Sequence, residues 1–376
     1  MAEYLTNTTD LTKVATAIRE KGGTSDPLVY PDGFVVAIQA IQTGTELQII
    51  VSVTSGATVT ATKGSLSVSG TSVNGTCTLT VPEAGTWSVN ATLGGETSDT
   101  KSVTFTDRYE LAFFLVSAVL NDNDWATIKT VSDAGQGANY WSIGDRKAVT
   151  LDGTVGHLTL SNYTTYAFII GFNHNQELEG TNRIHFQLGK TALSDGTDVC
   201  LCDSSYNSNV STTDYFSMNS SRTSSGGWAG SQMRTNICGT SLSSYSGTII
   251  AVIPAALRAV LKSVTKYTDN TGEGSTAESD ITATTDYFFL LSEYEVFGSI
   301  SYGNSNESSK QAQYAYYSAG NSKVKYKNNG TGSAAFWWLR SQRASKSYRF
   351  VIVAANGTGS GYVANISSGF APGFCV

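Results

Sequence analysis

The sequence predicts a multidomain, β-rich chain with a short helical module, an all-β sandwich and a larger α+β domain. The charged fraction is only 14% and proline occurs only 5 times, while Gly, Ser, Thr, Asn and Tyr are abundant. This composition is typical of many short strands joined by turns. The apolar pattern also changes from helical spacing to alternation near residue 45. A length of 376 residues allows two or three such domains.

The first region, residues 1–44, is expected to hold two short helices. Apolar residues recur at helical spacing in two stretches, Leu11, Val14, Ala15 and Ile18, and then Phe34, Ile38 and Ile41. Two short helices cannot bury their apolar faces alone. Attachment to a larger particle or trimerisation is therefore the favoured interpretation. A helical hairpin that caps the next domain is the alternative.

The second region, residues 45–107, alternates apolar and polar residues in short bursts. Strands with one buried face each are expected at 49–53, 59–61, 66–68, 77–81, 87–91 and 103–105. This spacing predicts a small immunoglobulin-like sandwich that acts as a spacer and carries no chemistry. Trp87 lies within the alternation, so we expect it in the core.

The third region, residues 108–376, is predicted to be an α+β domain. Strands are expected at 148–151, 167–172, 183–188, 249–252 and 287–291, and helices at 125–132, 254–261 and 311–319. A domain of this size needs long loops, and residues 268–279 have the composition of one. The run 109–120 is apolar and fits either a strand or a buried short helix.

Charge and hydropathy exclude two classes of partner. The formal net charge of -6 argues against a nucleic-acid binder, which needs a basic surface. No apolar stretch approaches the roughly 18–20 residues that cross a bilayer, and the first residues lack the layout of a secretory signal. We therefore expect no membrane insertion and no export by the ordinary route.

The histidines offer only weak support for a metal or catalytic site. They are His157, His174 and His185, and none lies in a recognised zinc or triad motif. His174 could bind a metal together with Glu177 or Glu179. A histidine that hydrogen-bonds a nearby carboxylate is the favoured interpretation. We predict no catalytic residue, no metal and no cofactor.

The cysteines likewise form no recognisable site. Cys77, Cys200, Cys202, Cys238 and Cys375 are spread over the chain without a repeated Cys-x-x-Cys pair. Buried free thiols are the favoured interpretation, and a disulfide from Cys238 to Cys202 or Cys200 is the alternative.

Several separated motifs resemble the C-type-lectin-fold proteins of phage tails. They are Ala-Ala-Phe-Trp-Trp-Leu-Arg-Ser at 334–341, Gly-Gly-Trp at 226–228, Met-Arg at 233–234 and Gly-Phe-Ala-Pro-Gly-Phe at 369–374. Many of that group are variable proteins diversified by retroelements, and their fold relatives include formylglycine-generating enzymes. The resemblance covers roughly residues 125–376 and implies a C-type-lectin-like fold for 108–376. The first two regions are similar to phage tail modules and to Ig-like spacers of bacteria and phages.

The resemblance places a display hairpin at about 337–376. By position in the variable relatives, the displayed side chains that would contact a ligand are Arg343, Ala344, Lys346, Tyr348, Arg349, Ile352, Ala354, Ser360, Tyr362, Val363 and Ile366. We call these the display residues. The frame residues that would hold them are Trp337, Trp338, Leu339, Phe350, Val353, Phe370 and Phe374.

These features predict a receptor-binding protein of a phage tail. It would be made in the bacterial cytoplasm, reside in the virion as a homotrimer beside other tail and baseplate proteins, and bind a bacterial surface protein or anionic glycan. Arg343, Lys346 and Arg349 form a basic cluster that is either a solvated face or an anion-binding one. The alternatives are a lectin-fold enzyme, oxidase-like or polymer-cleaving, and a purely structural fibre protein. Cys375 stands alone where the oxidising relatives need a cysteine pair, which argues against the enzyme.

Overall fold

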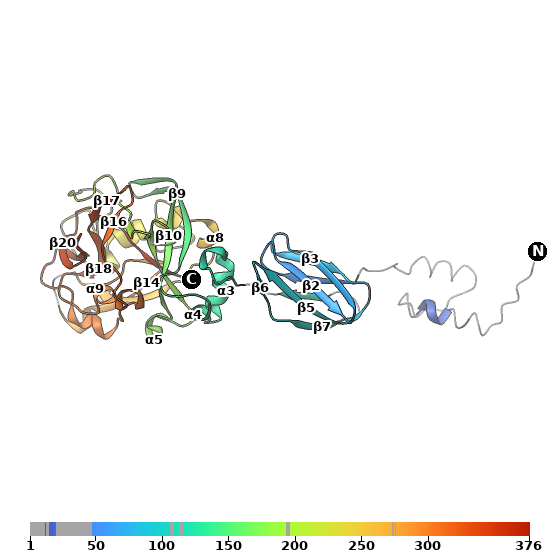
Figure 1. The fold of residues 1–376 in the computed structure, drawn as a ribbon. Coiled ribbons are helices and arrows are strands. Elements are labelled where there is room, and N and C mark those ends of the chain that lie inside the picture. The colour runs from blue at the N-terminus through green and yellow to red at the C-terminus, as the bar shows by residue number, and fades with distance from the viewer. Residues whose placement is uncertain are drawn as a thin grey trace, which may run out of the picture. The chain divides into compact units, whose positions relative to one another are not determined.

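The computed structural model describes residues 12, 15–19, 47–105, 109–112, 116–192, 196–272, 274 and 276–376. The chain is β-rich and multidomain, and it divides into two compact units, Met1–Leu115 and Val116–Val376 (Figure 1). Each unit has a hydrophobic core of its own. No helix within the described residues is both long enough and apolar enough to cross a membrane.

Little of the predicted N-terminal helical module falls within the described residues. Residues 15–19 are helical, and Ala15 and Ile18 are buried, as their spacing predicts. Leu11, Val14 and the second helix expected near 34–41 lie outside the described residues. Attachment and trimerisation through this module therefore stay predictions.

Two sheets build the first unit. One has the order β4-β1-β8, in which β1 pairs antiparallel with β4 and parallel with β8. The other has the order β3-β2-β5-β6, and β7 also pairs with β5. The strands are β1 (Gln48–Ser52), β2 (Thr58–Lys63), β3 (Leu66–Thr71), β4 (Thr76–Thr80), β5 (Gly85–Leu93), β6 (Glu96–Thr97), β7 (Lys101–Phe105) and β8 (Tyr109–Ala112).

Alternation along these strands places one face of each in the core. In β5, Trp87, Val89 and Ala91 are fully buried, while the residues between them are partly exposed. The indole of Trp87 donates its N–H to the carbonyl of Glu83 at 3.0 Å, so the buried ring keeps its polar group satisfied. The expectation that Trp87 belongs to the core is confirmed.

The boundary between the units lies further along the chain than residue 108, where the sequence places it. Tyr109–Ala112 form β8 and pair with β1 of the first unit. The apolar run at 109–120 therefore contributes one strand to the first unit. Its end begins the 3₁₀ helix η1 (Leu120–Asp122) of the second unit.

A five-stranded sheet crosses the second unit in the order β15-β21-β11-β10-β9, with antiparallel pairing throughout. Its strands are β9 (Arg146–Val155), β10 (Leu158–Phe172), β11 (Ile184–Lys190), β15 (Phe288–Phe289) and β21 (Gly373–Cys375). Strand β21 lies between β15 and β11 although it is far from both in sequence. As a result Val376 is fully buried.

Short helices surround this sheet. The longest of those described, α3 (Trp125–Asp133), packs Trp125 edge-on against Phe186 and Phe374, with ring centroids 5.7 and 6.2 Å apart. Asp124 caps it by accepting the Thr127 N–H at 2.7 Å. The other helices are α4 (Gly137–Tyr140), α5 (Gln176–Glu179), α6 (Gly227–Gly230), η2 (Met233–Cys238), α7 (Ile249–Val252), α8 (Ala255–Arg258), η3 (Glu278–Asp280), α9 (Glu293–Phe297), η4 (Ser305–Ser309) and α10 (Ala315–Ser318).

Several predicted elements of this unit change type or length. Residues 249–252 form helix α7 and not the predicted strand, because an apolar run of four residues is too short to show a period. The helices predicted at 254–261 and 311–319 shrink to α8 and α10, and the strand predicted at 287–291 shrinks to β15.

Three smaller sheets complete the second unit. One contains β12 (Val199–Cys200), β16 (Lys325–Lys327) and β17 (Gly330–Ala335), and another contains β13 (Val264–Asp269) and β14 (Ile281–Asp286). The third, which we call the terminal sheet, contains β18 (Trp337–Gln342), β19 (Arg349–Val353) and β20 (Gly359–Val363) in that order. In Figure 1, β20 lies at the periphery of the unit and β18 lies further inside.

Candidate functional site

The terminal sheet is closed by two tight connections. Between β18 and β19, the N–H of Arg343 donates to the carbonyl of Arg349 at 2.9 Å. Between β19 and β20, the N–H of Ala354 donates to the carbonyl of Thr358 at 2.7 Å, and Gly357 takes the left-handed conformation at φ 84°. The predicted hairpin is therefore present, with β19 and β20 in continuous antiparallel register.

Five of the seven frame residues belong to the terminal sheet, while Phe370 lies beyond it and Phe374 belongs to β21 of the central sheet. All seven predicted frame positions, from Trp337 to Phe374, are completely buried. Trp338 donates its indole N–H to the carbonyl of Phe216 at 2.9 Å, and Trp337 donates to the carbonyl of Lys323 at 3.0 Å. These bonds satisfy the polar edge of each buried ring and fix the orientation of β18.

The display residues are accessible with one exception. Ile352 is buried, with only 2% of its surface exposed, so its assignment as a displayed side chain is wrong. Phe350, Val351 and Val353 are buried as well, which shows that the middle of β19 is covered on both faces. The other display residues are half-buried or exposed.

A cluster of cations surrounds Tyr348 at the first connection. The guanidinium of Arg222 lies over the Tyr348 ring at 4.5 Å from its centroid, and that of Arg349 lies at 5.5 Å. Arg343 lies over the ring of Tyr302 at 5.1 Å, and Lys346 is exposed. We call Arg222, Arg343, Lys346, Tyr348 and Arg349 the Tyr348 surface.

The cations of the Tyr348 surface have no carboxylate partner among the described residues. None of the four forms an ion pair there, although the protein is acidic overall. Arg349 donates from Nη1 to the carbonyl of Gly361 at 2.9 Å, but its Nε has no hydrogen-bond partner. The hydrogen bond from Arg222, together with Arg349 and Lys346, lowers the pKa of Tyr348. The local field therefore favours negative charge.

Tyr362 is more constrained than the rest of the display residues. Its ring packs against Phe336 and Trp338, with centroids 5.5 and 6.1 Å apart, and its hydroxyl hydrogen-bonds the side-chain oxygen of Asn207. Substitution at this position would disturb the frame as well as the surface.

Beneath the terminal sheet lies a fully buried ionic network. A bulge in β18 between Trp338 and Gln342 separates Arg340 from β19, and its N–H donates to the carbonyl of Leu291 at 2.9 Å. The guanidinium of Arg340 forms a two-pronged ion pair with Glu295. Glu295 also accepts from the ammonium of Lys266 at 2.9 Å.

Lys266 connects this pair to a second carboxylate. Its Nζ donates to Glu179 at 2.6 Å and to the hydroxyl of Tyr314 at 2.9 Å. Burial alone would raise the pKa of Glu295, but the charges of Arg340 and then Lys266 lower it far below its usual value. We call Glu179, Lys266, Glu295 and Arg340 the buried network.

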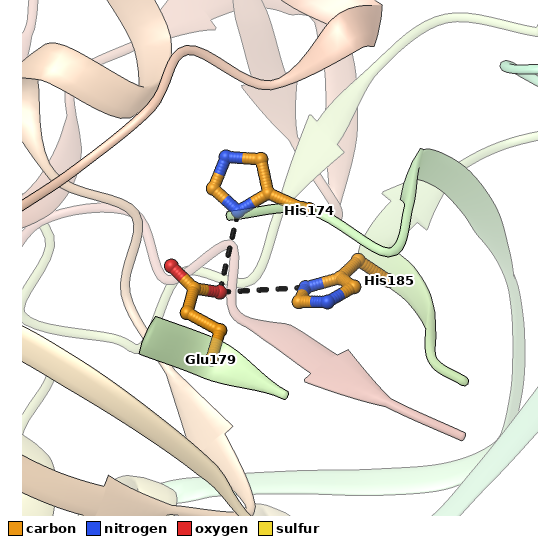
Figure 2. A group of neighbouring side chains, drawn as sticks. All are labelled: His174, Glu179 and His185. Atoms are coloured by element: carbon orange, nitrogen blue, oxygen red, sulfur yellow. Dashed lines mark hydrogen bonds and ion pairs between the residues drawn. The ribbon is translucent and has the colours of Figure 1, made fainter. Parts of the chain in front are cut away.

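Two histidines lie against Glu179 (Figure 2). His174 Nδ1 is 3.2 Å and His185 Nδ1 is 3.9 Å from the same carboxylate oxygen. The potential ligand atoms of these three residues lie within 4.8 Å of one another. However, the ammonium of Lys266 already contacts that oxygen and would repel a second cation. The hydrogen-bonding role predicted for His174 is present.

Cys375 lies next to His185, and its thiol is not activated there. Its Sγ lies 3.3 Å from Nδ1 of His185. Burial raises the pKa of the Cys375 thiol to about 12, so the nucleophilic thiolate is scarce at neutral pH. All five cysteines are free and buried, as predicted, and the alternative disulfide to Cys238 is not formed.

Comparison with known proteins adds a family match for the C-terminal part of the chain. Residues 201–376 match the model of a family described as a domain of unknown function, DUF6273. Neither the curated proteins nor the solved structures contain a match to this chain. The matched segment includes the terminal sheet, Arg222 and every member of the buried network except Glu179.

Sequence reasoning missed Arg222 and the buried network. Arg222 is remote from the hairpin in sequence, and no local motif marks it. Lys266 and Glu295 look like ordinary surface charges in sequence. Arg340 lies in a recognisable motif, and the apolar residues before it, Trp337, Trp338 and Leu339, indicate that this strand is buried.

Proposed function

We propose that this chain is a receptor-binding protein of a phage tail. In this proposal the second unit binds a bacterial surface protein or anionic glycan noncovalently through the Tyr348 surface and the accessible display residues. Tyrosine and arginine suit such a role because they supply large contact areas with directional polar groups. Weak binding by each copy would be strengthened by several copies on one particle.

The finer fold assignments belong to the same proposal. Two facing sheets with alternating burial support an immunoglobulin-like spacer. A terminal strand inserted into the central sheet, with a buried tryptophan-rich frame under an accessible hairpin, supports a C-type-lectin-like head. We extend the resemblance to a homotrimer in the virion, in contact with other tail or baseplate proteins.

One observation carries the proposal. Arg222, Lys346 and Arg349 gather around Tyr348, and Arg343 lies over Tyr302, on an acidic protein and without a carboxylate partner among the described residues. A face that served only solubility would gain from interspersed carboxylates, which reduce the repulsion between like charges. A ligand with negative groups would provide the missing partners.

Cell binding tests the proposal directly. We would label the full chain with a fluorophore and measure its binding to whole cells of a panel of bacterial strains. Tyr348→Ala and Arg222→Gln should each reduce binding by about tenfold or more, as central aromatic and arginine contacts do. Raising the salt concentration should weaken binding, because exposed charge interactions are screened.

A charge-matched control is available on helix α3. Lys129 is half-buried and pairs with Asp133 four residues away, so Lys129→Gln removes one positive charge away from the hairpin. Binding by this variant should equal that of the unmodified chain. Equal binding by all three variants would instead favour the purely structural fibre role.

A further inference from the structure

A cavity in the second unit lies apart from the Tyr348 surface. It has a volume of about 530 Å³ and is bounded by η1, the turn before β9, the end of β11 and helix α10. We call it the Arg146 cavity. Its lining includes Val119, Leu120, Ile143, Arg146, Lys190 and Tyr316.

Charged groups form part of the lining. The ammonium of Lys190 pairs with Asp198 and donates to the hydroxyl of Tyr316 at 2.8 Å. Behind it, Lys325 Nζ lies 3.7 Å from the other oxygen of Asp198. Two buried ammonium groups therefore share one carboxylate.

The other charged residues of the lining, Arg146 and Asp145, leave this excess of positive charge in place. Arg146 lines the cavity and donates from Nη1 to the carbonyl of Ala192. Asp145 is the cavity's own acidic residue, and its carboxylate accepts the N–H of Ser142 at 2.8 Å. Arg146, Lys190 and Asp145 thus line the cavity, while Asp198 and Lys325 belong to the ionic cluster that contains Lys190.

Two of these cations have unused donors among the described residues. Arg146 Nε and Lys325 Nζ are buried and lack a hydrogen-bond partner. Such a donor costs free energy unless something accepts from it. Lys325 is completely buried, and burial lowers its pKa although Asp198 opposes the change. An anion in the cavity would compensate the positive charge.

Part of the lining is apolar. Val119 keeps 54% of its surface exposed, an unusual fraction for an aliphatic side chain in this unit, and it lines the cavity with Leu120 and Ile143. The cavity volume falls in the range that holds small molecules. A lining with charged and apolar parts suits a ligand with both characters.

We propose that the Arg146 cavity binds a small organic carboxylate, with its anionic end at Arg146 and Lys190 and its apolar body against Val119, Leu120 and Ile143. This site is separate from the Tyr348 surface and does not depend on the function proposed for it. The cavity binds its ligand without covalent change.

Octanoate is a suitable probe, and octan-1-ol is its uncharged counterpart. Titration calorimetry on the full chain should show one saturable site for octanoate, with binding of octan-1-ol at least about tenfold weaker, the ratio expected for losing a charge-assisted hydrogen bond. Arg146→Gln should weaken octanoate binding by a similar factor, and Arg146→Lys should restore part of it. Equal affinity for octanoate and octan-1-ol would overturn the proposal.

Further variants separate the site from a general effect on folding. Ala118 is exposed and lines the cavity, so Ala118→Trp should block octanoate without changing any charge. Arg222→Gln should leave octanoate binding unchanged while it reduces cell binding. Circular dichroism would verify that each variant is folded. Failure of octanoate to saturate the folded chain, or an equal loss in Arg146→Gln and Arg222→Gln, would refute the cavity proposal and leave the receptor-binding proposal standing.

Discussion

The cations of the buried network are paired with carboxylates, whereas those of the Tyr348 surface have no carboxylate partner among the described residues. In the network, Arg340 and Lys266 contact the carboxylates of Glu295 and Glu179, and all four side chains are almost completely excluded from water. At the Tyr348 surface, the three arginines lie over aromatic rings, and no described carboxylate pairs with them or with Lys346. The two regions are connected, since Arg340 belongs to the strand that leads into the surface connection.

Under the proposed function, this difference separates folding from recognition. A buried charge must have a partner, because an unpaired one costs several kcal/mol (on the order of 3–5 when one partner is removed). An exposed charge keeps its water and contributes little to stability. Substitutions in the network should therefore affect folding, and substitutions at the surface should affect binding.

Removal of Arg340 should have the largest effect. Arg340→Met leaves Glu295 buried with only Lys266 as a charged partner, so the free energy of unfolding should fall by about 3–5 kcal/mol. Urea denaturation followed by tryptophan fluorescence would measure the change.

A second substitution serves as the control. Arg340→Met combined with Glu295→Gln removes both charges while it keeps an acceptor for the N–H of Ser292, which Glu295 caps. The double variant should regain part of the lost stability. If the single variant is as stable as the unmodified chain, the network does not anchor β18.

Glu307, which lies next to the network, should make the stability of the chain depend on pH. Burial raises its pKa from the ordinary 4.5 to about 7, although Ser341 donates to its carboxylate. Between these values the native state holds a proton that the unfolded chain has released. The contribution of Glu307 to stability is therefore full below about pH 4.5 and is lost as the pH rises to about 7, by on the order of 3 kcal/mol.

Glu307→Gln should remove this dependence. Relative to the unmodified chain, the variant should become more stable as the pH rises through this window, as measured by urea denaturation at several pH values. Burial lowers the pKa of His185, so the titration of His185 makes the chain more stable as the pH rises. This effect is the same in both proteins and cancels when their stabilities are subtracted. A difference that stays constant with pH would contradict the prediction.

A matched pair of isoleucines tests the boundary between frame and surface. Ile352→Val removes a buried methylene and should destabilise the chain by about 0.5–1.5 kcal/mol, whereas Ile366→Val, at a half-buried position, should cost less. Thermal unfolding of the two variants gives the comparison. Equal losses would place both side chains in the same environment.

The smallest stability effects are expected at the Tyr348 surface. Lys346→Gln and Arg222→Gln should each change the free energy of unfolding by less than about 0.5 kcal/mol, while Arg222→Gln reduces cell binding. Denaturation and cell binding measured on the same preparations would reveal the separation. A large loss of stability in either variant would mean that the surface is part of the fold.

The sequence predicts the elements of this fold that have a regular apolar pattern. Alternation locates the strands of the first unit and the burial of Trp87, and the tryptophan-rich block locates the frame. It fails at Ile352, because β19 is covered on both faces and such strands lack alternation. It also fails at 249–252, where a four-residue apolar run fits either a helix or a strand.

Contacts between distant segments carry no local signal. Arg222 reaches Tyr348 from a loop before α6, and Lys266 reaches Glu179 from the hairpin of β13 and β14. Burial of a charge depends on where its partner lies in space, and one sequence does not contain that information. The candidate surface was therefore found only in part, through the residues of the hairpin itself.

The position of β21 determines when the second unit can finish folding. Translation runs from the amino end, so residues 373–375 leave the ribosome after every other strand of the central sheet. Until they arrive, β11 and β15 have no strand between them, and the exposed backbone groups at this gap would attract chaperones or proteases. A premature stop before residue 373 would thus leave this gap open, even in a chain whose hairpin is complete.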